Sequence, residues 1–304
     1  MSQHLAFDLA WSGNEHSTMP DQLDRALRED GFVQLSCPAF DWSLANTVFD
    51  EAAWFFDQDL AFKQAFAYRS AAENFGYQGF GDEALDPSSG AADRKETFTM
   101  RGLLEPAQDR SWPSETFQQA MVGFYTTCFD LAKNVMECLA AIGGLPADFF
   151  VRAHSGENVT LRLLYYPEGE ATGEVVAGAH TDYGLMTLLF QDGVDGLQVE
   201  SKPDHWLDVD SAVDAVVLNT GDLMAHWSND RFPSTRHRVC RRSSKARLSI
   251  AFFCDPDAKT VVEVQPGFMA DGDHVRYAKT TAGEHIQAKL LASHHAAQAA
   301  GRED

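Results

Sequence analysis

Three residues of metal-binding types occur at a spacing that could form one site. His180 and Asp182 are separated by a single residue in AGAHTDYG, and His237 follows in STRHRV. Alternate residues of an extended strand point to the same face, so His180 and Asp182 can hold one ion together. Two imidazoles and one carboxylate form a ligand set typical of non-haem iron(II), with coordination positions left open. The pattern predicts an iron(II) centre at His180, Asp182 and His237.

A second pair of polar residues follows the distal histidine by about one hairpin. Arg247 and Ser249 occur in RLSIAFF and again share one face of a predicted strand. A guanidinium group binds a carboxylate through two parallel hydrogen bonds. The pair therefore predicts a carboxylate-binding position on the strands that carry the metal ligands.

Short β-rich runs from about residue 158 onward must position these side chains. They are separated by Gly, Pro, Asp and Ser, as in strands joined by turns, and they predict roughly eight strands that close as a double-sheet jelly roll. The runs are VTLRLLYYP, GLMTLLFQD, GLQVE, AVVLN, STRHRVCRR, ARLSIAFFCDP and TVVEVQP.

The first half of the chain is predicted to be mainly helical. Short helices are expected over 21–28 and 42–60, and a long amphipathic helix over 114–142, ending at Gly143-Gly144. We predict one catalytic domain over 1–304, of α+β class and mainly β. It comprises a helix-rich region (1–112), a supporting helix (113–145), the jelly-roll core (156–268), and a C-terminal helix with its tail (280–304).

Composition limits the classes of partner. The formal charge of −21 over 304 residues would repel nucleic acid, and no apolar stretch reaches the roughly 18 residues of a membrane span. Five cysteines without a C-x-x-C pair argue against disulfides, and no secretory signal is visible. We expect a cytoplasmic protein that acts on a small molecule, without nucleic acid or membrane partners. The oligomeric state is not readable.

The order His-x-Asp, His, Arg-x-Ser on strands of one jelly roll resembles the 2-oxoglutarate and iron(II)-dependent dioxygenases of the isopenicillin N synthase-like group. The resemblance also includes GYQGFGDEALDP, DRKETFTM, LRLLYYP, NTGDLMAHWSND and TAGEHIQAKL. It implies that His180, Asp182 and His237 bind iron(II), and that Arg247 and Ser249 hold the distal carboxylate of 2-oxoglutarate.

The resemblance further implies that the Tyr166 hydroxyl assists in binding 2-oxoglutarate. The family often has asparagine two residues earlier, where Leu164 stands here. The implied reaction consumes O2 and 2-oxoglutarate, releases succinate and CO2, and hydroxylates the substrate, with desaturation or cyclisation as alternatives. The acidic surface and the enclosed mouth of a jelly roll favour a small-molecule substrate, either acidic or amino-acid-like. An oxidase of the same fold that uses no 2-oxoglutarate, and a non-catalytic metal-binding jelly roll, are the competing interpretations.

Strand alternation extends the predicted site to the substrate. If Tyr166 faces the cavity, Leu164 and Arg162 do as well, and an inward arginine needs an anionic partner. That partner is either an acidic group of the substrate or a nearby Asp or Glu. Phe253 lies on the same face of the predicted strand as Arg247. Its ring either contacts the substrate or belongs to the hydrophobic core.

Two further polar positions have weaker signals. His226 in MAHWSND, on a predicted strand, lacks a carboxylate at strand spacing and is a weaker candidate ligand. Asn219 and Asp222 in NTGDL are interpreted as parts of a turn, with Gly221 supplying backbone freedom.

Overall fold

Two β-sheets pack against each other and form a jelly roll, as predicted. The computed structural model describes residues 3–6, 18–83, 85–86, 93–105, 110–170 and 172–289. The major sheet has the order β1 (Gln3–Ala6), β2 (Phe32–Ser36), β10 (Ala215–Thr220), β7 (Met186–Gln191), β12 (Arg247–Cys254), β5 (Thr160–Tyr166), β4 (Glu96–Arg101) and β3 (Phe75–Gln78). The minor sheet has the order β6 (Val175–His180), β11 (His237–Cys240), β8 (Leu197–Lys202) and β9 (His205–Asp208). A short pair, β13 (Val261–Val262) and β14 (Thr280–Thr281), lies outside both.

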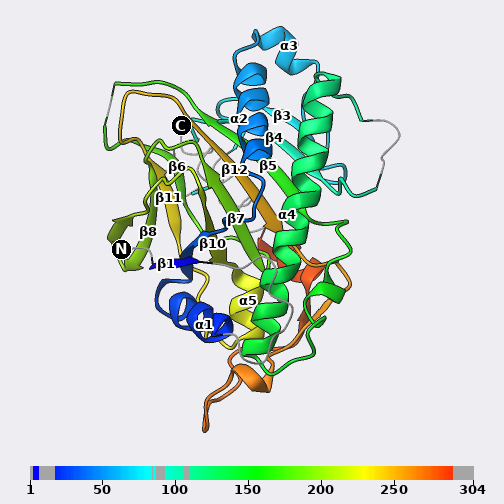
Figure 1. Ribbon diagram of the computed structural model, residues 1–304, viewed down its shortest axis with the longest axis vertical. Helices are drawn as coiled ribbons and strands as arrows, with labels where there is room; N and C mark the ends of the chain where they lie inside the picture. Colours follow the sequence, from blue (N-terminus) through cyan, green and yellow to red (C-terminus); the bar gives the residue numbers. More distant parts are fainter. Residues whose placement is uncertain are drawn as a thin grey trace, which may run out of the picture.

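Helices cover the face of the major sheet that points away from the minor sheet (Figure 1). Phe124 of α4 packs edge-on against Phe190 of β7 at 5.0 Å between ring centroids, and Phe55 of α2 packs against Phe98 of β4 at the same distance. Each fully buried ring stabilises the layer by about 1.5–3 kcal/mol. The helices are α1 (Met19–Asp30), α2 (Trp42–Phe56), α3 (Leu60–Gln64), α4 (Glu115–Ile142) and α5 (Asp222–Trp227), with short 3-10 turns at Val151–Ala153 and Pro266–Phe268 and a helical segment over 282–289.

The predicted supporting helix is confirmed almost to the residue. The Ser114 hydroxyl caps α4 by accepting a hydrogen bond from the Phe117 N–H, and Gly143 follows the last turn. The helix predicted over 42–60 ends at Phe56, and a separate short helix begins at Leu60. Asp59 accepts a hydrogen bond from the Phe62 N–H and so begins α3 as a separate element.

The region before residue 113 also supplies strands, which its sequence pattern does not predict. β2 pairs with β10, and β4 pairs with β5, so both extend the major sheet. These short segments become strands because they pair with distant partners, and their own residue pattern is too brief to indicate it. The part of the predicted C-terminal tail beyond residue 289 lies outside the described residues.

Candidate metal centre

The two histidines of the predicted site lie directly opposite each other in the minor sheet. His180 ends β6, His237 begins β11, and the two are register partners with ring centroids 4.3 Å apart. Asp182 does not continue β6, as the alternation argument assumed, and lies in the loop that follows. The loop still brings its carboxylate to the two rings, so the three predicted residues form one cluster.

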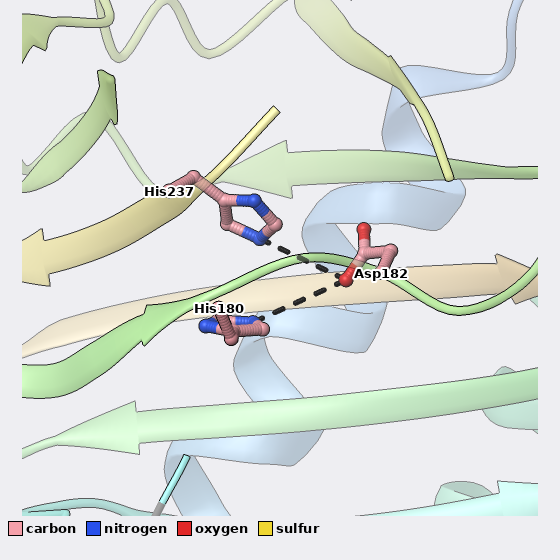
Figure 2. Close-up of side chains that lie close together, drawn as sticks. All are labelled: His180, Asp182 and His237. Atoms are coloured by element: carbon pink, nitrogen blue, oxygen red, sulfur yellow. Dashed lines mark ion pairs between the residues drawn. The ribbon is translucent and has the colours of Figure 1, made fainter. Parts of the chain in front are cut away.

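The potential ligand atoms converge on one another (Figure 2). Asp182 Oδ1 lies 4.0 Å from His180 Nε2 and 3.7 Å from His237 Nε2. The Nδ1 atoms of His180 and His237 face the carbonyl oxygens of Gly178 at 2.8 Å and Thr235 at 3.2 Å. A protonated Nδ1 that donates to a carbonyl leaves Nε2 with its lone pair, which is the form that binds a metal.

The surroundings keep His180 in a protonation state that suits metal binding. Burial and the adjacent His237 ring lower the pKa of His180, so its imidazole is neutral near pH 7. Asp182 is buried, which opposes its ionisation. The His237 and His180 rings and two hydrogen bonds nevertheless hold the pKa of Asp182 below its ordinary value. Two imidazoles and one carboxylate fit a divalent ion such as iron(II).

Two residues that the sequence pattern does not reveal orient the carboxylate. Thr187 donates a hydrogen bond to Asp182 Oδ2 at 2.6 Å, and the Asn219 amide donates to the same oxygen at 2.7 Å. Thr187 and Asn219 are register partners on β7 and β10. The interpretation of Asn219 as part of a turn is wrong, because this residue belongs to a strand. The only signal in the sequence is its inward position in the alternation of β10.

Arg247 and Ser249 lie together on β12, as predicted. Arg247 donates to Ser249 Oγ at 3.2 Å, to Gln191 Oε1 at 2.9 Å and to the Val194 carbonyl at 3.1 Å. The guanidinium lies 5.2 Å from the centre of the Tyr166 ring, and Tyr166 is its register partner on β5. Gln191 is a positioning residue that the sequence pattern does not indicate.

A narrow cavity adjoins this group. Four cationic side chains, three valines and Tyr166 are among the residues around it. Its lining includes Tyr166, Val176, Val194, Asp195, Val239, Arg241, Arg242, Lys245 and Arg247. Leu164 packs beside Tyr166 and Val176, where it offers apolar contact and no hydrogen bond. The Tyr166 hydroxyl makes no hydrogen bond to a described residue.

Arg162 is paired with an internal carboxylate, which is the second of its two predicted partners. Its Nη2 forms an ion pair with Glu83 and also donates to Thr97 Oγ1 at 3.2 Å. Burial alone would raise the pKa of Glu83, but Arg162 and Lys95 outweigh it and lower the pKa to about 2. Glu83 is therefore ionised and compensates the guanidinium charge.

A second buried ion pair links the start of β4 to the minor sheet. Lys95 pairs with Asp93 and lies 3.4 Å from Glu83. Asp93 in turn accepts a hydrogen bond from the Gly178 N–H of β6 at 3.0 Å, two residues before His180. On this side of the site two cations, Arg162 and Lys95, therefore face two carboxylates, and their charges balance.

Phe253 lies beside one of the groups that orient Asp182. Its register partners are Thr160 on β5 and Thr187 on β7, and it is partly exposed, unlike the fully buried Phe252 beside it. This position next to Thr187 agrees with a side chain that borders the reaction site.

His226 lies on helix α5 rather than on the predicted strand. Its ring stacks on Tyr277 at 4.7 Å, and it is not part of the cluster of potential ligands among the described residues. The strand prediction for this segment was wrong because the turn at Gly221 leads into a helix. His226 therefore packs against Tyr277 in the C-terminal part of the chain and not against the metal centre.

Family models agree with this site and fold. The 2OG-Fe(II) oxygenase superfamily model matches residues 157–256, which include all three candidate ligands and Arg247. A model for the non-haem dioxygenase N-terminal region, described for morphine synthesis, matches residues 6–120.

Curated relatives match over most of their length. A 2-oxoglutarate-Fe(II) type oxidoreductase, hxnY, of Emericella nidulans is 30% identical, and the match covers 96% of this chain and 89% of that protein. A homoarginine-6-hydroxylase of Glycine max is 32% identical, and the match covers 89% of this chain and 87% of that protein.

Solved structures agree in fold and in co-substrate. A full-length Neurospora crassa protein in complex with alpha-KG superposes with a TM-score of 0.84 at 31% identity, covering 95% of both chains. The same protein in complex with alpha-KG and thymine gives 0.84 at 30% identity, covering 96% of this chain and 97% of that one. The chain belongs to the 2OG-Fe(II) oxygenase superfamily and is an enzyme that uses iron(II), 2-oxoglutarate and O2.

Proposed function

We propose that this oxygenase hydroxylates a small molecule bound between the metal centre and the β4–β5 side of the major sheet. His180, Asp182 and His237 hold the iron(II). The observation that carries this assignment is the convergence of three potential ligand atoms, within 4.8 Å of one another. Three protein ligands leave open positions for the co-substrates, in contrast to a fully coordinated structural site.

Arg247, Ser249 and Tyr166 bind the distal carboxylate of 2-oxoglutarate in this proposal. The support is a guanidinium fixed by Gln191 and Val194, a neighbouring hydroxyl on Ser249, and a Tyr166 hydroxyl that binds no described residue. Fixing the guanidinium in advance reduces the ordering that binding would otherwise require. Because Leu164 has no polar side-chain atom, it cannot make the hydrogen bond to 2-oxoglutarate that an amide side chain could make at this position.

Arg162, Leu164 and Phe253 border the substrate. The Arg162 side chain is 15% exposed, and its Nε has no hydrogen-bond partner among the described residues. Because Glu83 already balances its charge, Arg162 can donate a hydrogen bond but supplies little net attraction for an acid. The amino-acid-like or polar neutral class of substrate is thereby favoured over a purely acidic one.

The bound iron(II), 2-oxoglutarate and O2 supply the oxidation that converts a C–H bond into C–OH, with release of succinate and CO2. The side chains of this protein determine geometry. Thr187 and Asn219 hold the Asp182 carboxylate so that Oδ1 faces the histidine rings, and Arg247 orients the co-substrate. Phe253 and Arg162 place the substrate beside the centre. Such positioning accounts for a large share of rate enhancement when the cofactor provides the reactive chemistry.

A cytoplasmic location remains part of this proposal. All five cysteines are free and buried, which suits a reducing compartment. Among the helices of the described residues, none is long and apolar enough to cross a membrane.

Binding of 2-oxoglutarate tests the assigned carboxylate site. Anaerobic titration of the iron(II)-loaded protein should give a saturable charge-transfer absorption, and Arg247→Gln should raise the Kd for 2-oxoglutarate at least about tenfold, because a charged hydrogen-bond partner is lost. Arg152→Gln is the matched control, since that guanidinium pairs with Asp148 at the surface, away from this cavity. An equal Kd in wild type and Arg247→Gln would contradict the assignment.

A further inference from the structure

Asp255 adds a carboxylate to the face of β12 that carries the proposed binding residues. It follows Cys254, the last residue of the strand, and continues the alternation through Ala251 and Phe253. Residues two apart on an extended chain point to the same side. Asp255 is partly exposed, as Phe253 is.

The carboxylate of Asp255 lies against the loop that carries a candidate metal ligand. A Cβ added to Gly184 would collide with Asp255 Oδ1, so the carboxylate is packed on the backbone of Gly184. Gly184 lies two residues after Asp182. Burial and, to a smaller extent, the negative charge of Asp182 raise the pKa of Asp255 to about 7, against the opposing effect of Arg101. The contact with Gly184 thus places the Asp255 carboxylate beside the loop that carries Asp182.

No described residue compensates this carboxylate. Asp255 forms no hydrogen bond and no ion pair with any described residue, and Arg101, the cation that acts on it, does not come within ion-pair distance. The carboxylate is partly exposed, so its oxygens can accept hydrogen bonds from a molecule that occupies this side of the site. A bound molecule that donates hydrogen bonds would supply the missing partner.

The opposite side of the site shows the contrast. Arg162 is paired with Glu83 and Lys95 is paired with Asp93, so neither cation needs an anion from the substrate. The carboxylate of Asp255 lacks such a pair among the described residues. A bound molecule with a hydrogen-bond donor near Asp255 would therefore complement the site.

From this we infer that Asp255 is a specificity-determining residue that binds an N–H group of the substrate, which is a nitrogen-containing metabolite such as an amino acid, a guanidine or an N–H heterocycle. The inference rests on the proposed function and narrows its substrate class. Phe253, two residues earlier on the same face, would then contact the carbon skeleton while Asp255 fixes the nitrogen.

Matched probes test this inference with the full-length protein loaded with iron(II) and 2-oxoglutarate. Each pair contrasts an N–H compound with a relative that lacks the N–H group: thymine with 1,3-dimethylthymine, L-proline with cyclopentanecarboxylate, and L-homoarginine with hexanoate. Binding is measured anaerobically as a shift of the charge-transfer absorption, and turnover is measured as stimulated succinate formation. The variants are Asp255→Asn, which keeps the volume, and Asp255→Leu, which removes every acceptor. Asp271→Asn, at an exposed carboxylate, is the control.

The expected result is that at least one N–H probe binds, at least tenfold more tightly than its partner. Asp255→Asn should raise its KM several-fold, Asp255→Leu should raise it further, and Asp271→Asn should leave it unchanged. Equal binding within every pair, an unchanged KM in both Asp255 variants, or no response to any N–H probe would overturn the inference. The charge-transfer titration with 2-oxoglutarate alone, on the same samples, shows separately whether the proposed oxygenase centre is intact.

Discussion

The two oxygens of Asp182 have different surroundings. Oδ2 accepts hydrogen bonds from Thr187 and Asn219, and Oδ1 faces the two histidines. A carboxylate on a loop could rotate freely without such partners. These hydrogen bonds therefore hold the carboxylate in one orientation, although Asp182 lies in a loop and not in a strand.

Asn219→Ala removes one of these donors and should weaken iron(II) binding about tenfold or more, as is typical for residues that orient metal ligands. The measurement is an anaerobic iron(II) titration of the metal-free protein. Asn134→Ala is the matched control, since that amide bonds only to the Asp130 carbonyl of its own helix. An iron(II) affinity equal to that of wild type would contradict the role of Asn219 and would show that Thr187 alone suffices.

The three candidate ligands could be predicted from the sequence, but the residues that orient them could not. His180, Asp182 and His237 are chemically distinctive types in a telling order. Asn219 occurs in NTGD, a typical turn sequence, and its role depends on pairing with Thr187 across two strands. Register over that distance is not readable from local pattern. The partner of Arg162 was left open for the same reason, because Glu83 is distant in sequence.

Ionised Glu83 pairs with Arg162 of β5, beside β4 in the major sheet. Its pKa is lowered from 4.5 to about 2, so its stabilising effect is fully present above about pH 4.5 and is lost as the pH falls toward 2. Glu83→Gln should lower the free energy of unfolding by about 2 kcal/mol at about pH 6, after allowance for partial exposure. Urea denaturation across this range should show the difference from wild type shrinking below about pH 4.5.

Glu73→Gln, at an exposed carboxylate in the preceding segment, should show no such pH-dependent difference. If the difference between wild type and Glu83→Gln stayed constant from about pH 6 to about pH 3.5, ionised Glu83 would not stabilise this part of the sheet.

Helix α4 is joined to the start of β5 by one buried hydroxyl. Tyr125 Oη lies 3.0 Å from the carbonyl oxygens of both Gly156 and Val159. Tyr125→Phe leaves these carbonyls without that donor and should destabilise the protein by about 1–2 kcal/mol. Urea denaturation measures the loss, with exposed Thr126→Ala as the control. An unchanged free energy of unfolding would mean that water replaces the hydroxyl at no cost.

The long helix and most strands of the jelly roll were predictable from the sequence, whereas the strands contributed by the region before residue 113 were not. α4 has a sustained helical period, a serine cap and terminal glycines, so its limits follow from local sequence. β12 and β5 are runs of eight and seven mostly apolar residues. β6, β3 and β4 are short or glycine-containing, and they become strands only through their neighbours. The break between α2 and α3 depends on one capping aspartate, Asp59.

At the scale of the molecule, one sheet performs two tasks. Helices α2 and α4 cover its outer face (Figure 1), where the side chains form the aromatic core. Arg247, Phe253 and Arg162 occupy alternate positions of β12 and β5 that share one face of the sheet with Tyr166. The two-residue alternation of β5 and β12 separates these tasks. The fold therefore holds the groups proposed for co-substrate and substrate on rigid strands, which is the arrangement that precise positioning requires.

Oxidation at this centre is coupled to 2-oxoglutarate, and this coupling can be measured directly. The experiment follows O2 consumption and succinate formation simultaneously in the iron(II)-loaded enzyme, with and without the N–H probes. We predict equal amounts of succinate formed and O2 consumed, and loss of both in Asp182→Ala. Consumption of O2 without succinate would contradict the coupling and would indicate an oxidase that draws its electrons from the substrate.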